Sequence, residues 1–511
     1  MRIRNSTWAG LVAVSLLVTA CSSGSAGKGA NGTTDSTATT IAASTTSTAP
    51  PVVRPAGPAA DLSHELTGGA GVFMAAGSPE NLNGTGYVQH EYAAAGTATS
   101  YRVQGALSAN GRWTFVPAVR APYRTRIVVR RPAKAADFSG TVVVEWLNVS
   151  GGLDADPEWT SLSEQIIRHG DAWVGVSAQQ LGIVGGPVLV ATPVGQDIVG
   201  KGLKKIDPAR YGSLFHPGDG YSFDIFTQVA RALRAGGVPL GGPKPQEILA
   251  AGESQSAFAL TTYVDGVQPL THAFDGFFVH SRGAAGLPLA APGQNAGIAG
   301  ALGGVAAIFR TDQAVPVLDL QSESDVTGLL DSAAAHQPDS DRFRLWEVAG
   351  TSHADVHLVG PAATKAIKCG VLINNGPMHI VAKAALASLD DWVRTGRLPP
   401  AAPRLELTAG TKPTVRRNAD AIALGGIRTP VVDVPVDAVS GAPGPVASTI
   451  CILLGSTTPL SPARLAQLYP SRATYVQRFD ADADAAIKAG FVLAADRPAL
   501  LAFAQPDRIA N

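Results

Sequence analysis

The residues with the clearest chemical meaning lie at positions 252–256, which read Gly-Glu-Ser-Gln-Ser. A short apolar run, Ile248 to Ala251, precedes this turn, and a segment that favours helix follows it. Such a strand–turn–helix arrangement exposes a nucleophilic serine at the end of a strand, in front of the free N–H groups of a helix start. We therefore predict that Ser254 is a nucleophile. A serine that only caps the helix is the alternative, and the pentapeptide alone does not separate the two.

A serine that performs acyl transfer needs a base to take its proton and a carboxylate to orient that base. Downstream of Ser254, the acidic segment 321–326 follows one apolar strand, and His353 follows the next. The order serine, acid, histidine is one of the known chain orders of a catalytic triad. Each residue also falls just past the end of a strand, where open sheets build their sites. We predict His353 as the base and Asp325 as the carboxylate, with Glu323 as the alternative acid.

The developing oxyanion needs N–H donors. We predict that the backbone N–H of Gln255 is one donor, because it follows the nucleophile directly. The second is expected from the turn Asn148–Val149, which follows a strongly apolar strand at 141–147. This second donor is the least certain part of the predicted site, because the chain has no His-Gly loop at that point.

Other polar clusters have simpler interpretations. His353, Asp355 and His357 have a spacing that could suggest a metal site, but a polar loop or helix start after the catalytic turn is favoured, because further ligands are lacking in the sequence. We therefore predict no metal. The acidic residues at 154, 156 and 158 could bind a cation or a polar substrate. A solvated acidic loop, with one residue capping the next helix, is the preferred interpretation.

The elements that must position these residues alternate along the chain. Apolar strand-sized runs are separated by segments with helical spacing, which predicts an α/β fold with a mostly parallel sheet and helices on both faces. Strands are expected at 141–147, 172–177, 248–251, 274–279, 315–320 and 343–348, helices at 158–168, 219–234 and 378–397, and an antiparallel region at about 87–131.

Two further parts of the predicted domain, residues 61–511, are less regular. Residues 283–304 are nearly all Gly, Ala, Pro and Leu, and we predict a lid insertion that covers an apolar pocket. Residues 400–511 are expected to be a C-terminal extension that packs on the core. Weak strands are predicted there near 404–407 and 430–434, and helices near 461–469 and 475–489.

The N-terminus indicates export. Residues 1–20 have a basic start and a short apolar stretch, and Leu17 to Cys21 resembles a bacterial lipobox. We predict a signal peptide, lipidation at Cys21, and anchoring to the membrane of the cell envelope through that lipid alone. An ordinary secretory peptide is the alternative. Residues 21–60 are rich in Ser, Thr, Ala, Gly and Pro, which predicts a disordered tether.

Composition narrows the possible partners. The chain of 511 residues has 40 basic and 40 acidic residues and no basic cluster, which argues against nucleic acid as a partner. Besides Cys21 it has only Cys369 and Cys451. In an exported protein these two favour a disulfide over free thiols.

Several of these segments together resemble a bacterial family of α/β-hydrolase domain-containing proteins. The resemblance extends from about residue 61 to the C-terminus and includes both Cys369 and Cys451. It implies an α/β-hydrolase fold and a serine nucleophile at Ser254, and it implies little about the substrate. The matching stretches are residues 145–149, 172–179, 210–219, 252–256, 322–325, 346–353 and 425–430.

The function expected from the sequence is that of a serine carboxylic-ester hydrolase. It would act on a small-molecule or lipid ester through an acyl-enzyme and would need no cofactor. One alternative is acyl transfer by the same triad to another acceptor. The other is a tethered binding protein without catalysis, which Ser256 in place of a second glycine in the turn keeps open.

Overall fold

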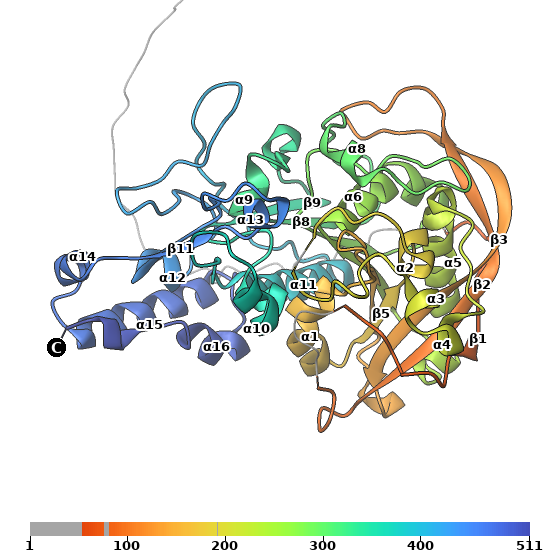
Figure 1. The fold of residues 1–511 in the computed structure, drawn as a ribbon, viewed down its shortest axis with the longest axis horizontal. Coiled ribbons are helices and arrows are strands. Elements are labelled where there is room, and N and C mark those ends of the chain that lie inside the picture. Colours follow the sequence, from red (N-terminus) through yellow and green to blue (C-terminus); the bar gives the residue numbers. More distant parts are fainter. Residues whose placement is uncertain (1–53, 76–80, 192, 511) are drawn as a thin grey trace, which may run out of the picture. The chain divides into compact units, whose positions relative to one another are not determined.

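The computed structural model describes residues 54–75, 81–191 and 193–510, and Figure 1 shows the fold. The predicted signal peptide, Cys21 and most of the predicted tether lie outside these residues and stay predictions. Residues 54–60, which we assigned to the tether, run beside the domain, because the N–H of Ala60 donates a hydrogen bond to the carbonyl of Gln228 over 3.0 Å. Among the described residues, no helix is long and apolar enough to cross a membrane.

The central sheet has nine strands in the order β1-β2-β3-β5-β4-β6-β7-β8-β9. The pairs β1–β2, β2–β3 and β3–β5 are antiparallel, and all pairs from β5 to β9 are parallel. The predicted α/β-hydrolase fold, with its mostly parallel sheet, is therefore confirmed. The strands are β1 Asp61–Glu65, β2 Tyr87–Val103, β3 Phe115–Pro132, β4 Thr141–Trp146, β5 Ala172–Val176, β6 Glu247–Glu253, β7 Gly276–His280, β8 Val317–Ser322 and β9 Phe343–Val348.

Helices cover both faces of this sheet. Side chains alternate between the two faces of a strand, and neighbouring residues of β4 accordingly belong to different hydrophobic clusters. Val144 packs with helix α5 (Ser222–Arg234) and helix α6 (Gln255–Thr262), whereas Val143 packs with helix α1 (Pro157–His169) and helix α11 (Met378–Thr395). The parallel strands β4 to β9 are mostly apolar because both of their faces are buried.

Short helices connect and flank these elements. Before α11 they are α2 Gln180–Val184, α3 Leu203–Ile206, α4 Pro208–Tyr211, α7 Gln268–Thr271, α8 Ile298–Leu302, α9 Glu323–Val326 and α10 Val356–Ala366. The remaining helices are α12 Pro430–Asp433, α13 Thr449–Leu453, α14 Pro462–Leu468, α15 Arg472–Lys488 and α16 Arg497–Leu501.

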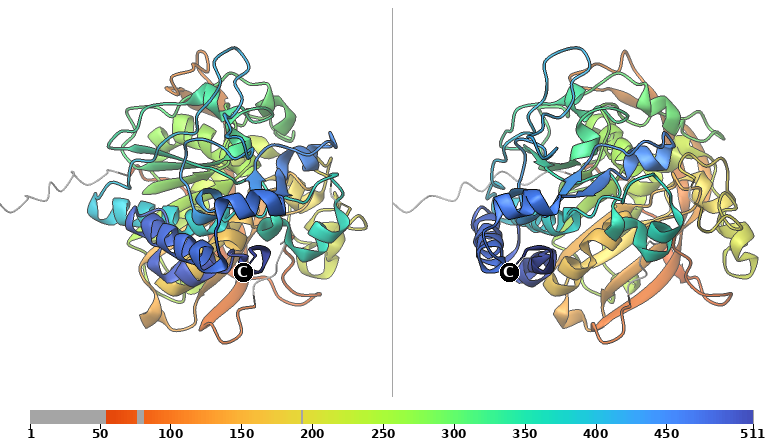
Figure 2. Two further views of the ribbon diagram at one scale, coloured as in Figure 1. Left: turned by 90° about the vertical axis from the view of Figure 1, so that its left-hand side faces the viewer. Right: turned by 60° about the vertical axis from the view of Figure 1, so that its left-hand side comes forward.

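The C-terminal segment lies at the β9 end of the sheet, as the blue elements of Figure 1 and Figure 2 show. Ile427 forms a parallel bridge to Val348 of β9, and a separate antiparallel pair is formed by β10 (Asp437–Ser440) and β11 (Ser456–Pro459). The prediction of a strand at 430–434 is wrong. The chain forms α12 there, because Pro430 occupies the first helical position, where its fixed φ angle favours a helix start.

Candidate active site

Ser254 stands on a strained turn between β6 and α6. Its backbone angles are φ 60° and ψ −120°, a conformation that a residue with a side chain rarely adopts. The turn is so tight that a Cβ atom added to Gly252 would lie 2.9 Å from Cβ of Ser256, and this distance explains why a glycine precedes the turn. The sharp turn places the Ser254 side chain at the carboxyl end of the sheet, in front of the first N–H groups of α6.

Three side chains predicted from the sequence lie in one hydrogen-bonded row. Oγ of Ser254 is 2.7 Å from Nε2 of His353, and Nδ1 of His353 is 2.7 Å from Oδ1 of Asp325. His353 and Asp325 are buried, with 6% and 0% of their surfaces exposed. In the neutral histidine with its proton on Nδ1, the ring donates to Asp325 and accepts from the serine hydroxyl. This arrangement can withdraw a proton from the serine.

Asp325 is held firmly at the start of α9. Its Oδ2 accepts hydrogen bonds from the Ser281 hydroxyl over 2.7 Å, from the Ser322 N–H over 2.7 Å and from the Ser322 hydroxyl over 2.6 Å. Burial disfavours the carboxylate, but His353 and these donors outweigh burial and lower the pKa of Asp325. The group therefore stays ionised and can orient the imidazole.

Glu323, the alternative acid, belongs to a different set of contacts. Its carboxylate accepts hydrogen bonds from the N–H groups of Gly350 and Gly441, both over 2.9 Å, and it pairs with Arg417. It therefore holds the turn that precedes His353 and does not contact the ring. The structure brings Asp325 and not Glu323 to the histidine.

The predicted oxyanion residues lie side by side, but one donor is already engaged. Gln255 occupies the first position of α6, where backbone N–H groups have no acceptor within the helix. The Val149 N–H donates to Oε1 of the Gln255 side chain over 3.2 Å. Asn148 uses its side chain to bind the Glu253 carbonyl over 3.0 Å and so fixes the turn against the end of β6.

A row of polar side chains behind this turn was not predicted. The Gln255 amide donates to Gln179, and Gln179 in turn donates to Oδ2 of Asp219 over 3.2 Å. Trp146 also donates to Gln179, over 3.1 Å. Asp219, the last residue of the stretch 210–219, therefore anchors the amides that orient the Gln255 side chain.

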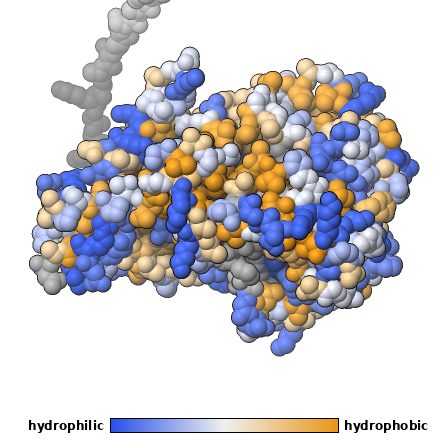
Figure 3. All heavy atoms as spheres, in the orientation of Figure 1, coloured by the Kyte–Doolittle hydropathy of each residue, from blue (hydrophilic) through white to orange (hydrophobic). Residues whose placement is uncertain are grey.

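An apolar cavity of about 410 Å³ opens at Ser254 and His353. Most of its lining is aliphatic or aromatic: Phe73, Met74, Leu153, Val190, Val194, Ile198, Val199, Leu358, Val359, Ala363, Ile450 and Leu453. In the orientation of Figure 1, hydrophobic residues gather on the face of the molecule between α13 and α2 (Figure 3).

The segment expected to be a lid does not line this cavity. None of the described residues that line it belongs to 283–304. Much of its wall is formed by residues 354–363, by helix α13, and by Val190, Val194, Gly195, Ile198 and Val199. Residues of the expected lid pack in the core instead. Leu287 is only 2% exposed, and its N–H donates to the carbonyl of Phe258 in α6 over 2.8 Å. The start of the segment, residues 283–287, is therefore closely packed, whereas residues 291–295 are exposed.

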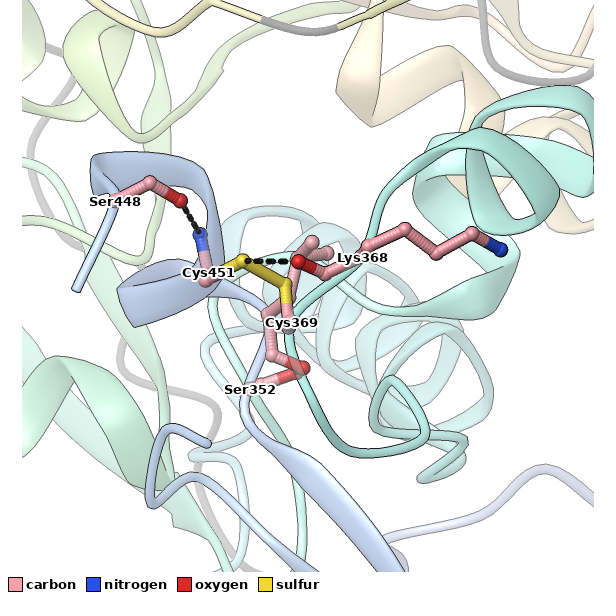
Figure 4. The surroundings of a disulfide bond; sticks show 6 residues. Ser352, Lys368, Cys369, Ser448 and Cys451 are labelled. Atoms are coloured by element: carbon pink, nitrogen blue, oxygen red, sulfur yellow. Dashed lines mark hydrogen bonds between the residues drawn. A yellow bond between two sulfur atoms is a disulfide. The ribbon is translucent and has the colours of Figure 1, made fainter. Parts of the chain in front are cut away.

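The disulfide predicted between Cys369 and Cys451 is present, and Figure 4 shows its surroundings. Cys451 lies in α13, between Ile450 and Leu453, which both line the cavity. The bond thus fastens one wall of the cavity to the segment that follows α10.

The acidic residues at 154, 156 and 158 are not a solvated loop, contrary to our expectation. They are at most 1% exposed. Asp154 pairs with Arg126 over 2.7 Å and Asp156 with Arg130 over 2.6 Å, so neither is available to a substrate. Asp156 precedes α1 but makes no side-chain capping bond. Arg126 and Arg130 of β3 flank the apolar run 127–129, and this pattern was the signal that could have predicted buried partners.

Asp355 and His357 lie at the start of α10, which agrees with the predicted polar loop or helix start. Asp355 caps α10 by accepting the N–H of Leu358 over 2.9 Å, and the His357 ring stacks on the His379 ring at a centroid distance of 3.7 Å. Among the described residues, no group of three or more His, Cys, Asp or Glu side chains is arranged to hold a metal ion.

The order of the sheet and the serine at the turn after β6 together define the class of this protein as an α/β-hydrolase. The chain belongs to the family described as alpha/beta hydrolase domain, because the model of that family matches residues 53–502. No curated protein matches the chain.

Solved structures with similar folds include bacterial and fungal enzymes. An α/β serine hydrolase without a lid from Xanthomonas campestris is 13% identical, with 50% of this chain and 86% of that chain covered and a TM-score of 0.26. One of two fungal esterases from Rhizomucor miehei is 10% identical, with 59% and 86% covered and a TM-score of 0.29. Carboxyl esterase 2 from Tuber melanosporum is 11% identical, with 57% and 88% covered and a TM-score of 0.27.

Proposed function

We propose that this protein is a serine carboxylic-ester hydrolase in which Ser254, His353 and Asp325 form the catalytic triad. The observation that carries the proposal is the unbroken row of 2.7 Å contacts from the Ser254 hydroxyl through His353 to Asp325. The strained turn at Ser254 supports it further, because strain of this kind gathers at functional sites.

In the proposed reaction, Nε2 of His353 takes the proton of Ser254 while the serine oxygen attacks the ester carbonyl. The imidazolium then gives its proton to the leaving alcohol, and an acyl-enzyme remains. A water molecule, deprotonated by the same histidine, attacks the acyl-enzyme, and the acid leaves as Ser254 regains its proton. The proton thus returns to its origin, and no cofactor is needed.

The oxyanion of each tetrahedral intermediate would be stabilised by backbone donors. We propose the Gln255 N–H as the first donor, because it stands at a helix start directly after the nucleophile. The Val149 N–H becomes the second donor when the Gln255 side chain turns away and releases it. The polar row ending at Asp219 would set how readily that happens.

The apolar cavity supports a substrate with a hydrocarbon acyl or alkyl group. Its volume of about 410 Å³ is in the range of sites for small organic ligands. Aliphatic walls gain free energy by removing such a group from water. No lysine or arginine lines the cavity among the described residues, and this favours a neutral ester over an anionic substrate. Lipidation at Cys21 would place this cavity at a membrane surface.

The experiment that tests the proposal is labelling of the full chain with a fluorophosphonate probe, followed by peptide mapping. We expect an adduct on Ser254 that disappears in Ser254→Ala and is strongly reduced in His353→Ala. The same three proteins are then assayed on neutral esters of increasing acyl length, with and without an alcohol acceptor. Absence of any adduct in a folded wild-type protein, together with no turnover, would rule the proposal out. Transfer to the alcohol in preference to water would identify an acyltransferase.

A further inference from the structure

A second carboxylate faces the histidine from the side of the nucleophile. Glu253 immediately precedes Ser254 at the end of β6, and its side chain is 6% exposed. Oε1 of Glu253 lies 3.5 Å from Nε2 of His353, the nitrogen that also contacts Ser254. This Oε1 atom is buried and has no hydrogen-bond partner among the described residues.

The surroundings of Glu253 do not supply a structural partner for that oxygen. His280 is its register neighbour on β7, and Nδ1 of His280 is directed to Glu158 of α1 at 3.3 Å. Asp325 of α9 lies beyond His353, at the other ring nitrogen. Burial, only partly offset by His353 and His280, raises the pKa of Glu253 to about 7. Because a buried polar oxygen without a partner destabilises a fold, this carboxylate is unfavourable for stability.

We propose that Glu253 is a positioning residue that acts through His353 and stabilises the imidazolium formed when Nε2 takes the serine proton. This inference rests on the proposed function. Two carboxylates then flank the ring, Asp325 at Nδ1 and Glu253 at Nε2. The proton passes from Ser254 to Nε2 and on to the leaving alcohol, so Glu253 itself neither gains nor loses a proton. Its role is electrostatic, in a site where water does not screen the charge.

The consequence is a more basic histidine. Burial opposes the charged ring, but Asp325 and Glu253 outweigh burial and raise the pKa of His353 to about 9. Glu253→Gln keeps the shape of the side chain and removes its charge, so the pKa of His353 must fall. A weaker base takes the serine proton more slowly, yet it stays neutral down to a lower pH.

The test is the pH profile of kcat/KM for wild type and Glu253→Gln on one neutral ester. We expect the acidic limb of the variant to move to lower pH by about one unit, and its plateau at high pH to fall roughly threefold to tenfold. The kcat/KM values of the two proteins therefore become equal at a pH below the half-maximum of the wild-type profile. Glu323→Gln is the matched control, because Glu323 is equally buried but does not contact His353. We expect the acidic limb of the kcat/KM profile of Glu323→Gln to stay at the wild-type pH.

Two further measurements separate this role from a structural one. The thermal midpoint of Glu253→Gln above about pH 7 should not fall, because the substitution removes a buried charge. Titration of the His353 ring by NMR should show the lower pKa directly. A variant that loses activity by one factor at every pH, with an unchanged His353 pKa, would overturn the inference. An inactive wild-type protein would contradict the proposed function. The effect of Glu253 on the pKa of His353 could still be tested, because the NMR titration needs no turnover.

Discussion

Nδ1 of His353 is 2.7 Å from Oδ1 of Asp325, whereas the carboxylate of Glu323, two residues earlier on the same short helix, contacts the turn that precedes the histidine. The two acids therefore have different tasks. One orients the base, and the other holds the loop that carries the base.

This difference predicts unequal effects of removing each charge. Asp325→Asn is expected to lower kcat roughly 10³- to 10⁴-fold, because the amide cannot hold the imidazole in the required tautomer. Glu323→Gln keeps an oxygen that can accept the N–H groups of Gly350 and Gly441, so its kcat should fall far less. Steady-state kinetics on a neutral ester measure both. Equal losses in the two variants would contradict the assignment of Asp325.

The activity should depend on pH with a definite sign. Only the neutral His353 can accept the serine proton, and its pKa is raised to about 9. We therefore expect kcat/KM to rise with pH up to a half-maximum near that value, after correction for spontaneous hydrolysis. The raised pKa also affects the free energy of unfolding. The charged His353 contributes its full stabilisation below the ordinary histidine pKa of about 6.5. This stabilisation is lost as the pH rises through about 9. A half-maximum at or below the ordinary value would show that the carboxylates do not act on the ring.

The wall formed by α13 should set the preferred acyl length. Ile450→Trp adds bulk to the cavity, and we expect kcat/KM for long-chain esters to fall about tenfold while short-chain esters are little affected. Val446→Trp serves as the control, because Val446 is 39% exposed and does not line the cavity. An unchanged chain-length profile in Ile450→Trp would place the acyl group elsewhere.

The disulfide should stabilise both the fold and this wall. It closes a loop of 82 residues, and its removal in a Cys369→Ala/Cys451→Ala variant should lower the free energy of unfolding by roughly 2–5 kcal/mol. We also expect KM for long-chain esters to rise, because α13 loses its attachment beside the cavity. Urea unfolding and ester kinetics test the two effects separately. Unchanged stability would mean that the C-terminal segment is held by its packing alone.

The buried charges of β3 are expected to be essential for stability. Arg126 donates to Glu91 over 2.9 Å and to Asp154 over 2.7 Å, and all three side chains are fully buried. Arg126→Met leaves the buried Asp154 without its arginine and Glu91 with Arg210 as its remaining cation, and it should destabilise the fold by roughly 3–5 kcal/mol. Arg120→Met, at an exposed position of the same strand, should change stability by no more than about 0.5 kcal/mol. Denaturant unfolding measures the change in the free energy of unfolding for both variants.

The parallel strands β4 to β9, the fold class and the chain order of the catalytic candidates could all be predicted from the sequence alone. These features depend on short-range patterns: an apolar run at β6, the small residue Gly252 before the turn, and acids and a histidine placed just after later strands. Local chemistry dictates them, because a buried parallel strand must be apolar and a sharp turn must avoid a Cβ clash.

The contacts between these side chains depend on the tertiary structure. Asp325 and Glu323 differ by two positions in sequence, and the direction of each side chain at the start of α9 separates their tasks. The local sequence favours a solvated loop at residues 154 and 156, but both carboxylates are buried against the arginines of β3. Much of the cavity wall comes from residues 194–199, residues 354–363 and α13, whereas Leu287 of the expected lid packs in the hydrophobic core. Such contacts join residues far apart in sequence, and they are set by how helices pack on the sheet, which no local pattern records.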